Sequence, residues 1–450
     1  MIPSEWSQPN SLLARLGLHR RELRAWAMYD WANSAFVLVI VTALFPIFYQ
    51  KVTAANLHPE TATTYFGWAT TIVLALVAVL SPILGALADF LGWRKRMLAV
   101  SLLVGVIPTG CMVFLQRGDW IPALVLFALG NLGLASSFVF YDSLLPHIAG
   151  PKEMDRVSGA GYALGYLGSG LLLALNILWI QSPGFWGIPD SETATRLSFL
   201  SVALWWLLFS IPTFRGISEP PSQIEADERR GMDAMKVTFQ RLRETFMDFR
   251  GAYRQAFLFL LAALVYSDGI GTIIRMAALY ASTRGLPQED VILAILLVQF
   301  LGVPFSFLFG GLAGFIGAKR SILVGLAVYT LTTIVAYSMD SVAEFYVLAI
   351  LVATVQGGTQ ALTRSLFASM IPRHRTSEFF GFYSVCDKLA GILGPMVFTL
   401  LIALTGSSQI AILSVSVFFV GGAVLLMLVD VEEGKREAKR AEEKMLGIGT

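Results

Sequence analysis

Charged and amide side chains recur inside the apolar stretches of this chain, at spacings that group them on helices. Asp268 and Arg275 are seven residues apart, which is two helical turns, so they share one face. Gln356, Gln360 and Arg364 follow one another at intervals of four and form a polar stripe. An ionisable group inside a membrane span costs roughly 2.5–3.5 kcal/mol on insertion scales and usually faces the bundle interior. These side chains are therefore candidates for solute binding or proton transfer.

An anion and a cation on one helix face suit a zwitterion such as an amino acid. We expect Asp268 and Arg275 to line one cavity, the alternative being structural pairs with other helices. Asp387 and Lys388 lie in a later apolar stretch. A salt bridge between Arg364 and Asp387 is one interpretation, and binding of a solute carboxylate by Arg364 or Lys388 is the other.

The stretch AWAMYDWANSAF, residues 25–36, places Asp30 and Asn33 one turn apart at the start of an apolar run. Asp30 precedes Tyr49 by 19 residues, or about 28 Å of helix. In a hydrocarbon core of about 30 Å, Asp30 should lie near one edge. We predict a gate or proton site at Asp30, with Asn33 facing the solute. Tyr166 is a further candidate for solute contact.

Proton coupling needs a carboxylate that can change its protonation state when its surroundings change. A carboxylate taken out of water inside a bundle has that property, because desolvation disfavours its charged form. The candidates for proton coupling are Asp30, Asp268 and Asp387.

Composition indicates which elements position these groups. The 450 residues are 56% hydrophobic and only 14% charged, whereas about a quarter of a soluble protein is charged. A helix needs about 20 apolar residues to span a bilayer. Twelve runs qualify, at about 25–49, 64–90, 97–115, 120–146, 157–181, 197–214, 257–282, 291–316, 321–339, 343–371, 379–405 and 409–430. The sequence thus predicts an all-α membrane protein with twelve spans.

The distribution of positive charge tests this count. Twenty-six of the 33 Lys and Arg residues fall in the segments that would lie on one side of the membrane together with both termini. Positive charge marks the cytoplasmic side, so we expect both termini there. The predicted domains are a cytoplasmic arm (1–24), two six-helix bundles (25–214 and 257–430), a cytoplasmic linker between them (215–256) and a charged cytoplasmic tail (431–450). We expect surface helices in the linker and the tail.

An internal repeat relates the two bundles. GALADFLGWRKR, from Gly85, and GGLAGFIGAKRS, from Gly310, share Gly, Leu, Ala, Phe and Gly at an offset of 225. Two six-helix halves related by an axis along the membrane normal are the plan of alternating-access transporters, with the solute near the midplane.

The first copy of this repeat resembles the signature loop of the major facilitator superfamily, G-x-x-x-D-x-x-G-x-R-K-R. The matching residues are Gly85, Asp89, Gly92, Arg94, Lys95 and Arg96. The resemblance implies a charge network that closes the cytoplasmic side, and we also expect Asp142 to pair with Arg94 or Arg96 in this gate. The second copy has Gly314 in place of Asp89, so the gate should be asymmetric.

Four strings narrow the resemblance further: MYDWANSAF, FYDSLLPHI, DRVSGAGYALGYLGSG and YSDGIGTII. Together they resemble the autophagy-related vacuolar amino-acid effluxer family of this superfamily, which has many bacterial members of unassigned substrate. The resemblance implies a multi-pass membrane location and amino-acid export. A bacterial cytoplasmic (inner) membrane is the expected site.

Signatures of other functions are absent from the sequence. It contains no G-x-x-x-x-G-K-[ST], HExxH or GxSxG motif and no cluster of histidines, so we expect no enzyme, cofactor or metal site. The expected partners are a small-molecule solute and the lipid bilayer, without nucleic acid, for a monomeric protein. We predict a secondary active transporter that moves a small polar solute, amino acids first, outward and with proton coupling. The alternatives are a transporter of sugars, drugs or lysolipids, and a non-transporting receptor or scaffold.

Overall fold

The computed structural model of the chain describes residues 11–221, 234–248 and 251–445. Parts of the predicted arm, linker and tail (1–10, 222–233, 249–250 and 446–450) lie outside the described residues. Within the described ranges, twelve helical segments are long and apolar enough to cross a membrane, in agreement with the predicted number and order.

The N-terminal half contains the first six of these segments. The first begins as α2 (Arg21–Ala35) and continues through a π-helix (Phe36–Leu44), α3 (Phe45–Phe48) and a second π-helix (Tyr49–Thr53). The other five are α4 (Pro59–Leu91), α5 (Arg94–Cys111), α6 (Trp120–Ile148), α7 (Met154–Gln181) and α8 (Ser191–Gly216).

The C-terminal half contains the other six segments, and shorter helices accompany both halves. The spanning segments are α10 (Arg254–Thr283), α11 (Gln288–Ile316), α12 (Ala318–Tyr337), α13 (Val342–Ser369), the pair α14 (Thr376–Leu389) and α15 (Leu393–Thr405), and α16 (Ser408–Leu428). Outside the spans lie α1 (Leu12–Arg15), α9 (Ala234–Asp248) and α17 (Val431–Met445), with single turns at Met112–Phe114, Pro183–Trp186 and Arg373–Arg375.

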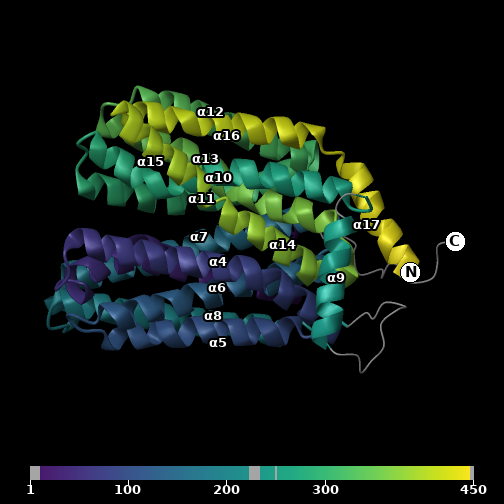
Figure 1. The fold of residues 1–450 in the computed structure, drawn as a ribbon, viewed down its shortest axis with the longest axis horizontal. Coiled ribbons are helices and arrows are strands. Elements are labelled where there is room, and N and C mark those ends of the chain that lie inside the picture. Colours follow the sequence, from purple (N-terminus) through teal and green to yellow (C-terminus); the bar gives the residue numbers. More distant parts are fainter. Residues whose placement is uncertain (1–10, 222–233, 249–250, 446–450) are drawn as a thin grey trace.

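The two halves lie side by side, and α9 and α17 lie together at one end of the bundle (Figure 1). We call this end the linker end. Helix α9 contacts both halves there. The Arg241 guanidinium lies 5.7 Å from the centre of the Phe90 ring of α4, and Arg375, next to α14, donates to Thr245 Oγ1 at 3.0 Å. The predicted surface helices of the linker and tail are thus α9 and α17.

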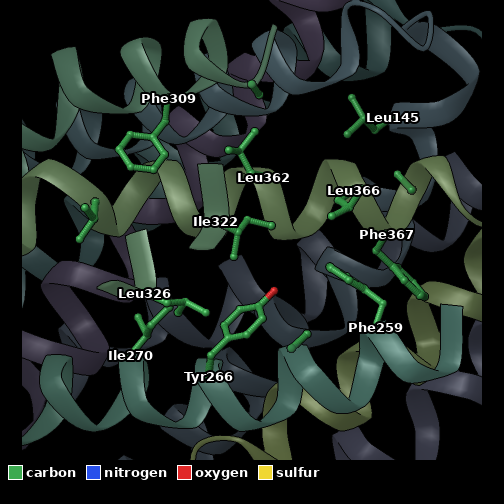
Figure 2. Packing of buried hydrophobic residues seen from close by; sticks show 14 of the residues in the cluster. Leu145, Phe259, Tyr266, Ile270, Phe309, Ile322, Leu326, Leu362, Leu366 and Phe367 are labelled. Carbon is green, nitrogen blue, oxygen red and sulfur yellow. The ribbon is translucent and has the colours of Figure 1, made fainter. Parts of the chain in front are cut away.

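One apolar core extends through the C-terminal half and into the linker end of the N-terminal half, and a second core lies within the N-terminal half. In the C-terminal half, Ile270 of α10 lies beside Leu326 of α12, and Phe259 of α10 lies toward Phe367 of α13 (Figure 2). Tyr266 lies among them, and its hydroxyl forms a 2.8 Å hydrogen bond with the hydroxyl of Thr363. This hydrogen bond satisfies two buried hydroxyls inside an apolar core.

The eleventh span is not the continuous helix that we expected over 379–405. It ends as α14 at Leu389 and resumes as α15 at Leu393. Pro395 has no amide hydrogen, so it cannot donate to the Gly391 carbonyl four residues earlier. Arg275 Nη1 donates to that carbonyl instead, at 3.1 Å. The break therefore follows from the proline and is stabilised by a charged side chain of α10.

Candidate functional site

Helix α4 meets α14 across the two halves at the linker end. A Cβ atom on Gly85 would lie 2.2 Å from the Ser377 carbonyl oxygen, and one on Gly381 would lie 2.6 Å from Pro82 Cα. Such close approach of two backbones requires glycine at both positions. We call this contact the α4–α14 seal.

Buried charges complete the α4–α14 seal. Asp89 is fully buried, and Arg94 Nε and Nη2 each lie 2.8 Å from its Oδ1. Its other oxygen accepts from the Glu378 backbone amide at 2.9 Å. The predicted network of the signature loop therefore forms between Asp89 and Arg94. It reaches the C-terminal half through two backbone groups, the Glu378 amide and the His374 carbonyl, which accepts from Arg94 Nη2 at 3.4 Å.

The other basic residues of the loop have different roles. Lys95 Nζ donates to the carbonyls of Phe214 and Ile217, so it fastens the end of α8. The Arg96 guanidinium lies over the Trp93 ring, 5.3 Å from its centre. Gly92 ends α4 in the left-handed conformation, with φ of 64°.

Arg364 of α13 makes the second contact between the halves. Its guanidinium lies 3.0 Å from Asp30 Oδ2 of α2 and 3.2 Å from Asp142 Oδ1 of α6. Nε donates to the Ser158 hydroxyl of α7 at 2.9 Å, and Nη2 donates to the Ser158 carbonyl at 3.1 Å. The arginine side chain is only 3% exposed, so a cation from one half is enclosed by acceptors of the other.

Three aromatic rings of the N-terminal half surround the same guanidinium. Its central carbon lies 4.6 Å from the centre of the Trp26 ring, 4.7 Å from Tyr162 and 5.6 Å from Tyr141. Cation–π attraction operates within about 6 Å and strengthens when water is excluded. We call the six side chains around Arg364 the Arg364 cage; they are Trp26, Asp30, Tyr141, Asp142, Ser158 and Tyr162.

The Arg364 cage is built by the N-terminal half alone. Trp26 stacks on Tyr141 with ring centres 4.5 Å apart, and Trp26 Nε1 donates to the Tyr141 carbonyl at 3.0 Å. Gly161 of α7 lets α2 approach, because a Cβ there would lie 2.3 Å from Asp30 Oδ2. The stack and its hydrogen bond are made within the N-terminal half and do not involve Arg364.

Two expected pairings are wrong. Arg364 pairs with Asp30 and Asp142, whereas Asp387 pairs with its neighbour Lys388, Nζ to Oδ2 at 2.6 Å. Asp142 therefore does not pair with Arg94 or Arg96. The physical reason is that the two side chains lie in different surroundings. Asp387 is half-exposed and lies beyond the α4–α14 seal, away from the linker end, whereas Arg364 points into the N-terminal half.

Asp268 and Arg275 share a face of α10, but no hydrogen bond joins their side chains. Arg275 is exposed and donates to the break in the eleventh span. Asp268 is 1% exposed, and neither carboxylate oxygen has a hydrogen-bond partner among the described residues. It lies where α15 begins, 3.2 Å from the position that a Cβ on Gly394 would occupy.

The remaining candidates are mostly enclosed. Asn33 is fully buried inside the N-terminal half, so the expectation that it faces solute is not met in this conformation. Tyr166 packs against Gly302 and Gly357 of the C-terminal half. Gln356 is buried and Gln360 is half-buried, and both lie on the face of α13 that leads to Arg364.

Sequence reasoning missed four of the six members of the Arg364 cage: Trp26, Tyr141, Ser158 and Tyr162. One signal was present, because both cage carboxylates directly follow a tyrosine, in Tyr29–Asp30 and Tyr141–Asp142. Among the residues that the structure describes, no group of three or more His, Cys, Asp or Glu side chains could hold a metal ion.

Comparisons with known proteins find relatives along most of the chain. Residues 60–439 match the family model described as vacuole effluxer Atg22 like. The MFS-type transporter YxiO of Bacillus subtilis (strain 168) is 36% identical over 421 residues, which cover 92% of this chain and 95% of that protein. Autophagy-related protein 22 of Yarrowia lipolytica is 28% identical over 317 residues, 64% of this chain, and the match spans about half (52%) of that relative.

Solved structures share the fold at low sequence identity. The proton:xylose symporter XylE superposes with a TM-score of 0.70 at 14% identity, over 94% of this chain and 98% of that one. The human organic anion transporter MFSD10 superposes with a TM-score of 0.65 at 14% identity, over 90% and 99%. The chain is thus a multi-pass membrane transporter of the major facilitator superfamily and belongs to the Atg22-like effluxer family.

Proposed function

We propose that this transporter exports small polar solutes, amino acids in particular, by alternating access coupled to protons. The observation that carries the proposal is that the hydrogen bonds and ion pairs between the halves gather toward the linker end, whereas the apolar packing of α7 on α11 continues further, to Gly170 and Phe300. The α4–α14 seal runs from Asp89 and Glu378 to a 3.1 Å contact between the hydroxyls of Ser81 and Ser384.

Beyond the seal, α15 of the eleventh span packs loosely, and we infer that the bundle is open there. In α15, Met396, Leu400 and Leu404 are 56%, 53% and 73% exposed, and only Gly394 and Phe398 are buried. A transporter that is closed at one end and open at the other is one end state of an alternating-access cycle. The closed end carries most of the Lys and Arg residues, which favours a cytoplasmic linker end and an outward-facing conformation.

Direction and location are parts of the proposal. The match to an effluxer family supports export, and the Bacillus subtilis relative supports a bacterial cytoplasmic membrane. The buried charges of Asp30, Asp142 and Arg364 between the halves support a charged or zwitterionic solute over a neutral sugar.

The charge balance of the Arg364 cage supports proton coupling. Asp30 and Asp142 together carry two formal negative charges when ionised, and Arg364 supplies one positive charge. When the halves separate at the linker end, Arg364 leaves and both buried carboxylates lose their partner. An uncompensated buried charge is expensive, so uptake of protons by Asp30 or Asp142 would accompany opening. Asp268 is a second proton candidate, because it is buried without a partner among the described residues.

The test is transport by the full chain in proteoliposomes. Efflux of labelled amino acids should accelerate when a pH gradient is imposed, and a pH dye should record proton movement in the opposite direction. Absence of flux for every amino acid, while a known transporter in parallel vesicles is active, would contradict the proposed substrate class.

A reversible crosslink links such flux to the proposed cycle. In a background without Cys111 and Cys386, the changes Ser81→Cys and Ser384→Cys should form a disulfide that holds the linker end closed. Transport should stop on oxidation and return on reduction, whereas each single change should leave it insensitive to oxidant. Undiminished transport after complete crosslinking would refute alternating access through this end.

A further inference from the structure

The Arg364 cage has the composition of a binding site for an organic cation. Two carboxylates, three aromatic faces, a hydroxyl and a backbone carbonyl meet around one guanidinium. Carboxylates neutralise a cation, and aromatic faces attract it where water is excluded. The occupant in this conformation is a side chain of the other half.

We propose that the cage is a solute site for a guanidinium-bearing compound, such as arginine or a related amine, and that Arg364 fills it as an internal substitute when the linker end is closed. This inference rests on the proposed transport function, because the cage is emptied only when the halves separate there.

Three observations support an exchange between Arg364 and a solute. Two of the three cage rings are held without Arg364, since the Trp26–Tyr141 stack is made within the N-terminal half. Its occupant is delivered from the C-terminal half, which moves away on opening. Its two carboxylates exceed the charge of one arginine, so the empty cage attracts a cation more strongly than a neutral solute.

The exchange also gives a direction to the cycle. A cationic solute enters the cage from the linker end when Arg364 is withdrawn. As the linker end closes, Arg364 returns with its own charge and competes for Asp30, Asp142 and the Ser158 carbonyl. The solute is displaced toward the open end, and protons compete for the same two carboxylates.

The change Arg364→Ala provides a direct test, since it removes the internal substitute and leaves the six cage residues unchanged. We expect millimolar guanidinium or ethylguanidine to raise the Tm of the purified variant by roughly 2–4 °C, in a saturable way, at constant ionic strength. Urea, which has the shape of guanidinium without its charge, should have no such effect. The native protein should respond little, because its cage is occupied.

The matched control combines Arg364→Ala with Asp30→Asn and Asp142→Asn. It keeps the same space and the same rings but removes both negative charges, so guanidinium should no longer stabilise it. Equal stabilisation of this control, or none in Arg364→Ala, would overturn the proposal.

A second measurement does not depend on the folding of these variants. The protein for this measurement retains Arg364 and carries Ser81→Cys and Ser384→Cys in the background without Cys111 and Cys386. Added arginine should slow disulfide formation severalfold, because a filled cage excludes Arg364 and keeps the linker end open. Citrulline, the neutral analogue of arginine, should not. Equal rates with the two compounds would refute the site.

The outcomes separate this inference from the proposed function. Export of neutral amino acids without any guanidinium effect would keep the transport function and remove the cation site. A charge-dependent guanidinium effect without amino-acid flux would keep the site and remove amino-acid export.

Discussion

The change Gly85→Ala should prevent closure of the linker end. The added Cβ would lie 2.2 Å from the Ser377 carbonyl oxygen, 2.7 Å from its carbonyl carbon and 3.1 Å from Glu378 Cα. All three are backbone atoms of α14, so no side-chain rotation can relieve the overlap. Overpacking of this kind costs about 1–3 kcal/mol, and this cost applies to the closed state only.

That cost corresponds to a shift of roughly 5–150-fold in the equilibrium between closed and open states. The assay is the rate of disulfide formation between cysteines placed at Ser81 and Ser384, whose hydroxyls lie 3.1 Å apart when the end is closed. The rate should fall by at least severalfold in Gly85→Ala, while the purified protein remains folded.

Gly67→Ala is the matched control for this prediction. Gly67 precedes Gly85 by 18 residues on α4, which is five helical turns, so both glycines lie on one face. A Cβ on Gly67 would meet no atom within 4 Å. Alanine there should be neutral or stabilise by up to about 1 kcal/mol through helix propensity. An equal effect of the two changes, or an unchanged crosslinking rate in Gly85→Ala, would refute a seal confined to the linker end.

Further changes test the buried charges and the glycine beside them. Arg364→Gln should lower the stability of the closed state by about 3–5 kcal/mol, because two buried carboxylates lose their cation. Asp142→Asn should lower it by only about 1 kcal/mol, because the arginine keeps a second carboxylate. Comparable Tm shifts for these two variants in thermal unfolding would contradict this charge count. Asp89→Asn should strongly lower the Tm, because it leaves the Arg94 guanidinium buried without its carboxylate. Adding Arg94→Gln to Asp89→Asn should recover part of this loss in Tm. A purely steric role of Asp89 would not predict such a recovery. Gly161→Ala should displace the Asp30 carboxylate of α2, because the new Cβ would lie 2.3 Å from Asp30 Oδ2. This variant should lose transport while its surface expression persists. Normal flux would show that the Arg364 cage tolerates the shift.

Much of the architecture was predictable because membrane insertion imposes simple constraints. A span must be long and apolar, and positive charge stays on one side. These local requirements give the twelve spans, and the repeat at Gly85 and Gly310 indicates two related halves. The pairing of Asp89 with Arg94 was also predictable, since five residues separate them across the short turn between α4 and α5.

The partners of Arg364 were not predictable from local sequence. They come from α2, α6 and α7, at separations of 334, 222 and 206 residues. Helical periodicity shows which residues share a face of one helix, but it does not show which helices face one another or how far they are rotated. The expected pairings of Arg364 with Asp387 and of Asp142 with Arg94 failed for this reason.

By itself, therefore, the sequence determined the number and order of the spans, the internal repeat and the residues that bear charge inside the bundle. Only the tertiary structure decided that one arginine of the C-terminal half enters a cage made by the N-terminal half. The physical reason is that a buried ion pair depends on distances of a few ångströms between separate helices. Those distances are set by packing, in which glycines such as Gly85 and Gly161 determine how closely the helices approach.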